Sequence, residues 1–195
     1  MANGQVITGF SKPKVAVYSY ASNAVTYASR MALARGVSVE LSLETSDTTD
    51  FHADNVVAES AGGVFTGGTV TLTVDGLKEE ARKLLMGLPA AEKVNDVDVY
   101  VYDDRQVIPY VGVGFVVRVM ENGITSYIPY VLTKVIFEED GLSAETQGES
   151  IEFQTSELTG TLMRDDTANH AWRKIGAGQT TEAAAEAVID SILGA

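Results

Sequence analysis

Cysteine is absent from all 195 positions of the chain. Disulfide frameworks, thiolate metal sites and cysteine nucleophiles are therefore excluded, because each of them needs the thiol group. Histidine occurs only twice, at His52 and His170, and tryptophan only once, at Trp172. The chain therefore offers few of the side chains on which catalysis and metal binding usually depend.

Positive charge is also scarce. The sequence has 14 Lys and Arg residues against 27 Asp and Glu residues, which gives a formal net charge of −13. Wrapping of nucleic acid needs clustered cations that neutralise phosphates, so this balance argues against a nucleic-acid-binding protein. It does not argue against a protein past which nucleic acid moves without binding.

Long hydrophobic runs are missing. The most apolar stretch, residues 107–117, contains Pro109, Gly112 and Gly114. It is too short to cross a bilayer as a helix, so we predict a buried strand there. Residues 1–10 have no cationic segment followed by an apolar run, which predicts that no signal peptide is present. We expect a soluble protein that is made in the cytoplasm and is not bound to a membrane.

Sequence motifs of enzymes are absent as well. Neither a phosphate-binding G-x-x-x-x-G-K-[ST] loop nor a complete G-x-G-x-x-G occurs, and G-x-S-x-G and H-E-x-x-H are missing. We predict no catalytic residue, no cofactor and no metal site, and an enzyme is the least favoured class.

Two features could still hold a ligand. Asp50, His52 and Asp54 would share one face of an extended segment, as a weak metal site needs. An exposed polar loop is the favoured interpretation, because no fourth ligand is indicated. Trp172 could stack on a ligand, but an aromatic side chain that anchors the C-terminal segment to the core is favoured.

The sequence does contain extensive alternation of apolar and polar residues. In residues 37–44, Val and Leu alternate with Ser and Glu, which is the pattern of a strand with one buried and one wet face. Residues 69–75 alternate in the same way. A tight turn is predicted at Asn122-Gly123. Further strands are predicted at residues 15–19, 55–60, 97–102, 110–120, 124–137 and 150–163.

Two helices are predicted. The first spans about residues 77–85 with Gly87 just after its end, and the second spans about residues 182–193 with Thr180 or Thr181 as N-cap. One face of the second helix carries an apolar stripe that must dock on the protein: Ala185, Val188, Ile189 and Ile192. No composition break marks a second domain. The predicted fold class is a mainly β, antiparallel sandwich or barrel in a single domain, residues 1–195, with a helix packed on it.

Residues 45–54, TSDTTDFHAD, form a polar stretch between two predicted strands. Ordinary hairpin connections are shorter, so a connection of this length is usually functional or mobile. We expect a long loop with a role in assembly, and the residues assigned to it are Thr45, Ser46, Asp47, Asp50, Phe51, His52 and Asp54.

An ordered set of segments resembles the major tail proteins of long-tailed bacteriophages of Gram-positive bacteria. The resemblance covers nearly the whole chain, and although each segment alone is weakly specific, the ordered set is specific. The segments are GFSKPKVAVY from Gly9, ARGVSVEL from Ala34, FHADN from Phe51, GGTVTLTVDGL from Gly67, YVGVGF from Tyr110, LTKVIF from Leu132 and GESIEFQTSELTGTLMR from Gly148.

The resemblance implies a tail-tube fold, with two packed antiparallel sheets flanked by a helix. It also implies homohexameric rings that stack into a hollow tube around a tape-measure protein. The tail terminator and the distal tail or baseplate proteins would be further partners. The protein would be part of the virion, made in the host bacterial cytoplasm, and the genome would pass through the lumen without specific binding.

A tube of this kind needs a lumen wall that does not hold DNA, and carboxylates repel phosphates. The predicted wet face of residues 37–44 carries Glu40 and Glu44, and we expect Glu59 on its partner strand. These three acids are the candidates for the lumen. A merely solvated sheet face explains them equally well.

Two other classes remain open. A tube of a phage-derived contractile particle or of a type VI-like secretion system shares the implied fold, and a tape-measure gene nearby would separate the two. A carbohydrate-binding β-sandwich would need exposed aromatic platforms, for which the single Trp172 offers little support.

Overall fold

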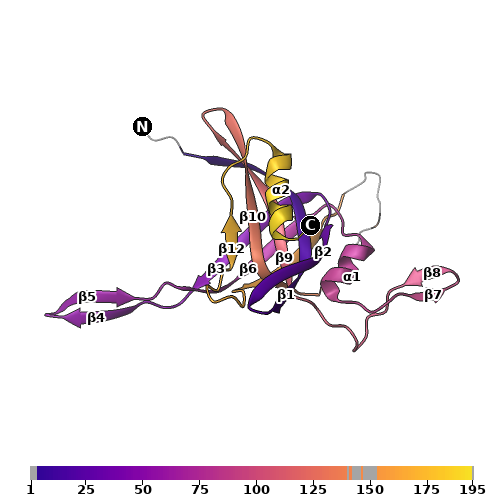
Figure 1. Ribbon diagram of the computed structural model, residues 1–195, viewed down its shortest axis with the longest axis horizontal. Helices are drawn as coiled ribbons and strands as arrows, with labels where there is room; N and C mark the ends of the chain where they lie inside the picture. Colours follow the sequence, from indigo (N-terminus) through magenta and orange to yellow (C-terminus); the bar gives the residue numbers. More distant parts are fainter. Residues whose placement is uncertain (1–3, 140, 142–145, 147–152, 195) are drawn as a thin grey trace.

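The computed structural model describes residues 4–139, 141, 146 and 153–194, and Figure 1 shows their arrangement. The chain is mainly β, with two short helices, as predicted. The elements are β1 (Val6–Ala21), β2 (Ala24–Ala32), β3 (Gly36–Thr45), β4 (Thr49–Ala53), β5 (Val56–Ala61), β6 (Phe65–Val74), α1 (Glu79–Met86), β7 (Glu92–Val94), β8 (Val97–Val99), β9 (Val111–Glu121), β10 (Ile124–Phe137), β11 (Ser156–Met163), β12 (Arg173–Ile175) and α2 (Glu182–Ile192).

Eight of these strands form one antiparallel sheet, in the order β2-β1-β9-β10-β11-β6-β3, with β12 paired to β10. The sheet curls until β3 contacts β1. Gly36 of β3 lies against the Phe10 ring of β1, where a Cβ atom would come within 2.3 Å of Phe10 Cε1. The prediction of antiparallel β structure is confirmed, but the main strands form one curled sheet rather than two separate ones.

The concave face of the curled sheet encloses the main core. Alternate residues of β6, among them Val70, Leu72 and Val74, are fully buried there, while the threonines between them are not. The helix α1 contributes Ala81 and Leu85 to the same core. Its end is the predicted one, with Gly87 in the left-handed conformation at φ 61°.

The helix α2 covers part of the convex face. Ala185, Ile189 and Leu193 pack on Ala16, Val116 and Val131 of the strands β1, β9 and β10. Its N-cap is Thr181, whose Oγ1 accepts a hydrogen bond from the backbone N–H of Ala184. The predicted docking of the second helix is therefore confirmed.

Ion pairs reinforce this contact. Lys14 Nζ lies 2.7 Å from carboxylate oxygens of both Glu186 and Asp190, and Arg30 donates to the backbone carbonyls of Asp190 and Gly194. These carboxylates raise the pKa of Lys14 although burial of its side chain acts in the opposite direction. Basic residues of β1 and β2 are thus already engaged with the acidic side of α2.

Several predicted boundaries need correction. The first helix begins at Glu79 rather than Leu77, because Asp75 instead receives hydrogen bonds from the backbone and guanidinium of Arg35. The strand predicted over residues 97–102 ends at Val99. Residues 107–110 lie outside β9, and Val107 is exposed. Of the strand predicted over 150–163, β11 covers Ser156–Met163, and residues 150–152 are outside the described part of the chain.

Two small hairpins leave the body of the protein. The strands β4 and β5 pair only with each other, as do β7 and β8. Figure 1 shows the two hairpins projecting at opposite ends of the molecule. The β9–β10 hairpin turns at Asn122 and Gly123, both with positive φ, as predicted.

The close approach of α2 depends on a glycine in β9. A Cβ atom at Gly114 would lie 2.3 Å from Ile189 Cγ2 and 3.0 Å from Leu193 Cδ1. We expect Gly114→Ala to lower the free energy of unfolding by about 1–3 kcal/mol, because the helix must shift off its site. Gly67→Ala is the matched control, since its Cβ would meet only ordinary contacts at 3.7 Å and beyond. Denaturant unfolding monitored by circular dichroism measures both, and equal stability of the two variants would contradict this account.

Candidate functional site

The most prominent feature is the hairpin of β4 and β5, hereafter the arm (residues 49–61). Every residue of both strands is exposed. The turn at the tip consists of Asp54 and Asn55, with φ of 50° and 66°, the conformation that two-residue hairpin turns require. Residues 45–54, predicted as a long loop, are therefore the end of β3, a short link, the whole of β4 and the first turn residue.

The root of the arm is fixed by short-range hydrogen bonds. The backbone N–H of Ser46 donates to the carbonyl of Val64 at 2.8 Å, and the N–H of Gly63 donates to the carbonyl of Ser46 at 3.2 Å. Farther out, the Ser60 hydroxyl donates to the Asp50 carboxylate at 2.6 Å. The arm is thus an ordered extension that begins where β3 and β6 stop pairing.

The arm combines exposed apolar side chains with negative charge. Phe51 is 64% exposed and Val56 is 61% exposed, and Val57 is also exposed. Phe51 pairs across the arm with Glu59, so an aromatic ring and a carboxylate share one face. The arm contains three acids and no Lys or Arg, namely Asp50, Asp54 and Glu59, and Asp47 precedes it in the link from β3.

Exposed apolar groups also gather at two other projections. Residues 94–99 include Val94, Val97 and Val99, which are exposed on the β7–β8 hairpin. Ile7 of β1 and Ile124 of β10 are each 71% exposed where these strands reach beyond the core. Contiguous exposed apolar surface usually marks a contact with another molecule.

The residues predicted for the lumen separate into two places. Glu40 and Glu44 lie exposed on β3, opposite Thr71 and Gly67 of β6. Glu59 lies on the arm instead, because the partner of β3 is β6 and not β5. Glu157 of β11 shares a face with Glu40. Glu157 pairs with Thr73 of β6 and Glu40 pairs with Thr71, and these two threonines lie on the same face of β6.

The convex faces of β3, β6 and β11 together form a polar surface, hereafter the threonine face. The strand register places its residues side by side, and none of them is Lys or Arg. The threonine face consists of Ser38, Glu40, Ser42, Glu44, Thr69, Thr71, Thr73, Glu157, Thr159 and Thr161. The helix α2 packs on β1, β9 and β10 and, among the described residues, does not pack on this half of the sheet.

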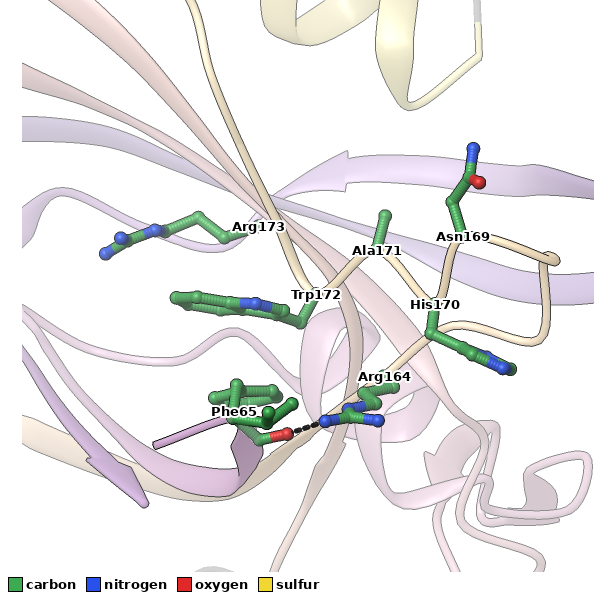
Figure 2. A pocket seen from close by; sticks show the side chains of 8 residues that line it. Phe65, Arg164, Asn169, His170, Ala171, Trp172 and Arg173 are labelled. Carbon is green, nitrogen blue, oxygen red and sulfur yellow. Dashed lines mark hydrogen bonds between the residues drawn. The ribbon is translucent and has the colours of Figure 1, made fainter. Parts of the chain in front are cut away.

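A pocket of about 380 Å³ lies at the root of the arm. It is lined by two arginines, one histidine, one asparagine and apolar groups, with no acid among them: Val64, Phe65, Arg164, Asn169, His170, Ala171, Trp172 and Arg173. Figure 2 shows the Trp172 ring lying over the Phe65 ring with the Arg164 guanidinium beside Phe65, to whose backbone carbonyl it donates.

Trp172 acts as the predicted anchor. Its ring stacks on Phe65 with centroids 4.2 Å apart, it packs against the main core, and the Arg173 guanidinium lies 4.4 Å from its ring centroid. The pocket itself was not predicted. Its arginines come from β12 and from the end of β11, and nothing in the sequence indicates that they meet Val64 and Phe65.

The segment that supplies the pocket is held by a charged network. Lys134 Nζ lies 2.8 Å and 3.0 Å from the two carboxylate oxygens of Asp166, and the Tyr18 hydroxyl donates to Asp166 at 2.7 Å. The bonds from Lys134 and Tyr18 hold the pKa of Asp166 below its usual range. Burial raises the pKa of Tyr18 to about 12.

Neither the weak metal motif nor a membrane segment is supported. Within the residues that the structure describes, no group of three or more His, Asp or Glu side chains could hold a metal ion, so Asp50, His52 and Asp54 do not form such a group. Of the helices in the described part, none is long and apolar enough to cross a membrane.

No protein-family model matches this chain, and no curated protein matches its sequence. The arm, the threonine face and the pocket are therefore the features that bear on function.

The pKa of Asp166 leads to a pH prediction. A carboxylate whose folded pKa is depressed stabilises the fold above its unfolded pKa, near 4, and this contribution is lost as pH falls through the folded pKa. We expect Asp166→Asn to be less stable than the wild type at pH 7, with the difference shrinking below about pH 4. Thermal unfolding across pH measures this.

The control is Asp104→Asn, because Asp104 is exposed and forms no ion pair within the described residues. A stability difference between Asp166→Asn and the wild type that stays constant across pH would contradict the role of Asp166.

Proposed function

We propose that this chain is a structural subunit of a bacteriophage tail tube, in which homohexameric rings stack into a hollow cylinder that delivers the genome. The observation that carries the proposal is the arm. A two-stranded hairpin is at best marginally stable alone in water, and this one leaves Phe51, Val56 and Val57 exposed. Contact with another copy would bury these side chains.

The edges of the sheet support assembly into rings. The strands β2 and β3 stand at the two ends of the strand order of the main sheet, and unpaired edge strands tend to pair with other chains. Two different edges that meet head to tail make a heterologous contact. Such contacts close into a ring when the rotation between neighbouring subunits divides a full turn evenly. The projections at opposite ends of the molecule also favour contacts between unlike surfaces (Figure 1).

The threonine face supports a lumen. A conducting wall must not bind the phosphate backbone, and each cation on it would add a salt-dependent attraction. This face carries carboxylates at Glu40, Glu44 and Glu157 and no Lys or Arg. A β-sheet face of serine and threonine hydroxyls remains hydrated without holding phosphates by charge.

The arm is tested by replacing it. A variant in which a short Gly-Ser turn joins Asp47 to Gly63 should keep its fold, because the main core lies within the curled sheet and α1. We expect the wild type to form tubes of uniform width at high concentration and the armless variant to form none, as seen by negative-stain electron microscopy. Changing the tip to Asn-Gly at positions 54–55 keeps the hairpin and should leave tubes intact. Normal long tubes from the armless variant, or a strictly monomeric wild type even with tape-measure and tail chaperone proteins present, would refute the proposal.

The lumen is tested by charge reversal. Glu40→Lys, Glu44→Lys or Glu157→Lys should leave stability within about 0.5 kcal/mol of the wild type, because each side chain is exposed on a strand surface. We expect genome ejection from such particles to be slowed, with relief at raised ionic strength, which screens the new attraction to DNA. Ejection kinetics at two salt concentrations measure this. Glu80→Lys on α1 makes the same charge change away from the threonine face and should eject normally. Normal ejection by all three variants would place these acids outside the lumen.

A further inference from the structure

The pocket at the root of the arm is an unusual surface for this chain. Its lining includes Arg164, Arg173 and His170 and no acid, although acids outnumber cations 27 to 14 in the sequence. Eight of the 14 Lys and Arg residues have a described carboxylate within 4.0 Å, among them Lys14, Arg35 and Lys134. Neither Arg164 nor Arg173 forms an ion pair with a described carboxylate.

The arm has the complementary chemistry. Residues 49–61 carry three acids, Asp50, Asp54 and Glu59, and no Lys or Arg. Its Phe51 and Glu59 form a cross-strand pair, so a ring and a carboxylate project together. The pocket offers the matching combination, with the stacked rings of Phe65 and Trp172 next to guanidinium groups (Figure 2).

The arm cannot place this pair in its own pocket. Glu59 lies five residues from Val64 at the root, on the order of 15 Å away along an extended strand. The hairpin is ordered by its own pairing and projects away from the body (Figure 1). A second copy of the chain is therefore the molecule that can bring an arm to the pocket.

We propose that the pocket at the arm root receives the Phe51–Glu59 pair from the arm of a second copy. The contact rests on the proposed tube function and identifies the receiving site for the arm. Glu59 then lies beside Arg173, and Phe51 adds to the aromatic pair of Phe65 and Trp172. Because the donor and acceptor surfaces differ, each copy gives one arm and receives another, which is a head-to-tail contact.

Cross-linking tests the contact directly, because the chain contains no cysteine. Full-length Ala58→Cys, on the arm, is mixed with full-length Asn169→Cys, on the pocket rim, under tube-forming conditions and then oxidised. We expect a disulfide-linked heterodimer on a non-reducing gel. Asn95→Cys, at the tip of the β7–β8 hairpin, is equally exposed and serves as the control partner. Equal cross-linking of Ala58→Cys to both partners, or none to Asn169→Cys, would overturn the proposal.

Charge exchange gives a second test. Glu59→Arg and Arg173→Glu should each slow assembly by about tenfold or more, because each places like charges together at the contact. The double variant should recover most of the wild-type rate, measured by light scattering. Lys174→Glu is the control, since Lys174 follows Arg173 in β12 but does not line the pocket. No recovery in the double variant would contradict the pairing.

The outcomes separate this contact from the tube function. Tubes that form without the Ala58–Asn169 cross-link would refute the contact and leave the tube intact. Oligomers that show the cross-link but never become tubes would support the contact and refute the tube. A chain that neither assembles nor cross-links would refute both.

Discussion

The division of the convex sheet face between α2 and solvent is the constraint on which the rest of the structure depends. Gly114 of β9 lets Ile189 and Leu193 approach the sheet closely, and ion pairs from Lys14 hold the helix in place. Within the described residues, α2 packs on β1, β9 and β10. The strands β3, β6 and β11 present serine, threonine and glutamate on the same side of the sheet, and these side chains are stable in contact with water.

The exposed apolar side chains on the projecting hairpins are not needed for the fold of the body. The concave face and the helix contact bury the residues that form the two cores, so the fold of the body needs nothing from the arm. The apolar side chains of Phe51, Val57 and Val97 are exposed on the projections and are not part of either core. Exposed apolar surface is unfavourable in water. Its position on ordered hairpins is typical of a surface that contacts another molecule.

Charge is distributed in a similar way. The ion pairs at α2 and at Asp166 engage Lys14, Arg30 and Lys134 inside the subunit. Among the described residues, no carboxylate forms an ion pair with Arg164 or Arg173, while the arm carries acids and no Lys or Arg. In contacts between proteins generally, complementary charge on the two surfaces contributes more to specificity than to affinity.

Local features of this protein were determined by the sequence itself. Alternation located β3 and β6, and a composition rich in Val, Tyr, Thr and Phe located β10. Asn122-Gly123 located a hairpin turn, and the threonine pair at 180–181 and Gly87 located helix ends, because each depends on residues only a few positions apart. The tertiary structure alone decided which strands pair. The polar composition of residues 45–54 predicted a loop, yet pairing with β5 made it an ordered arm. Pairing also put Glu157 rather than Glu59 on the face of Glu40, and brought Arg164 and Arg173 to Phe65. Strand partners and pocket walls are chosen by burial of the whole curled sheet, and no short window of sequence contains that information.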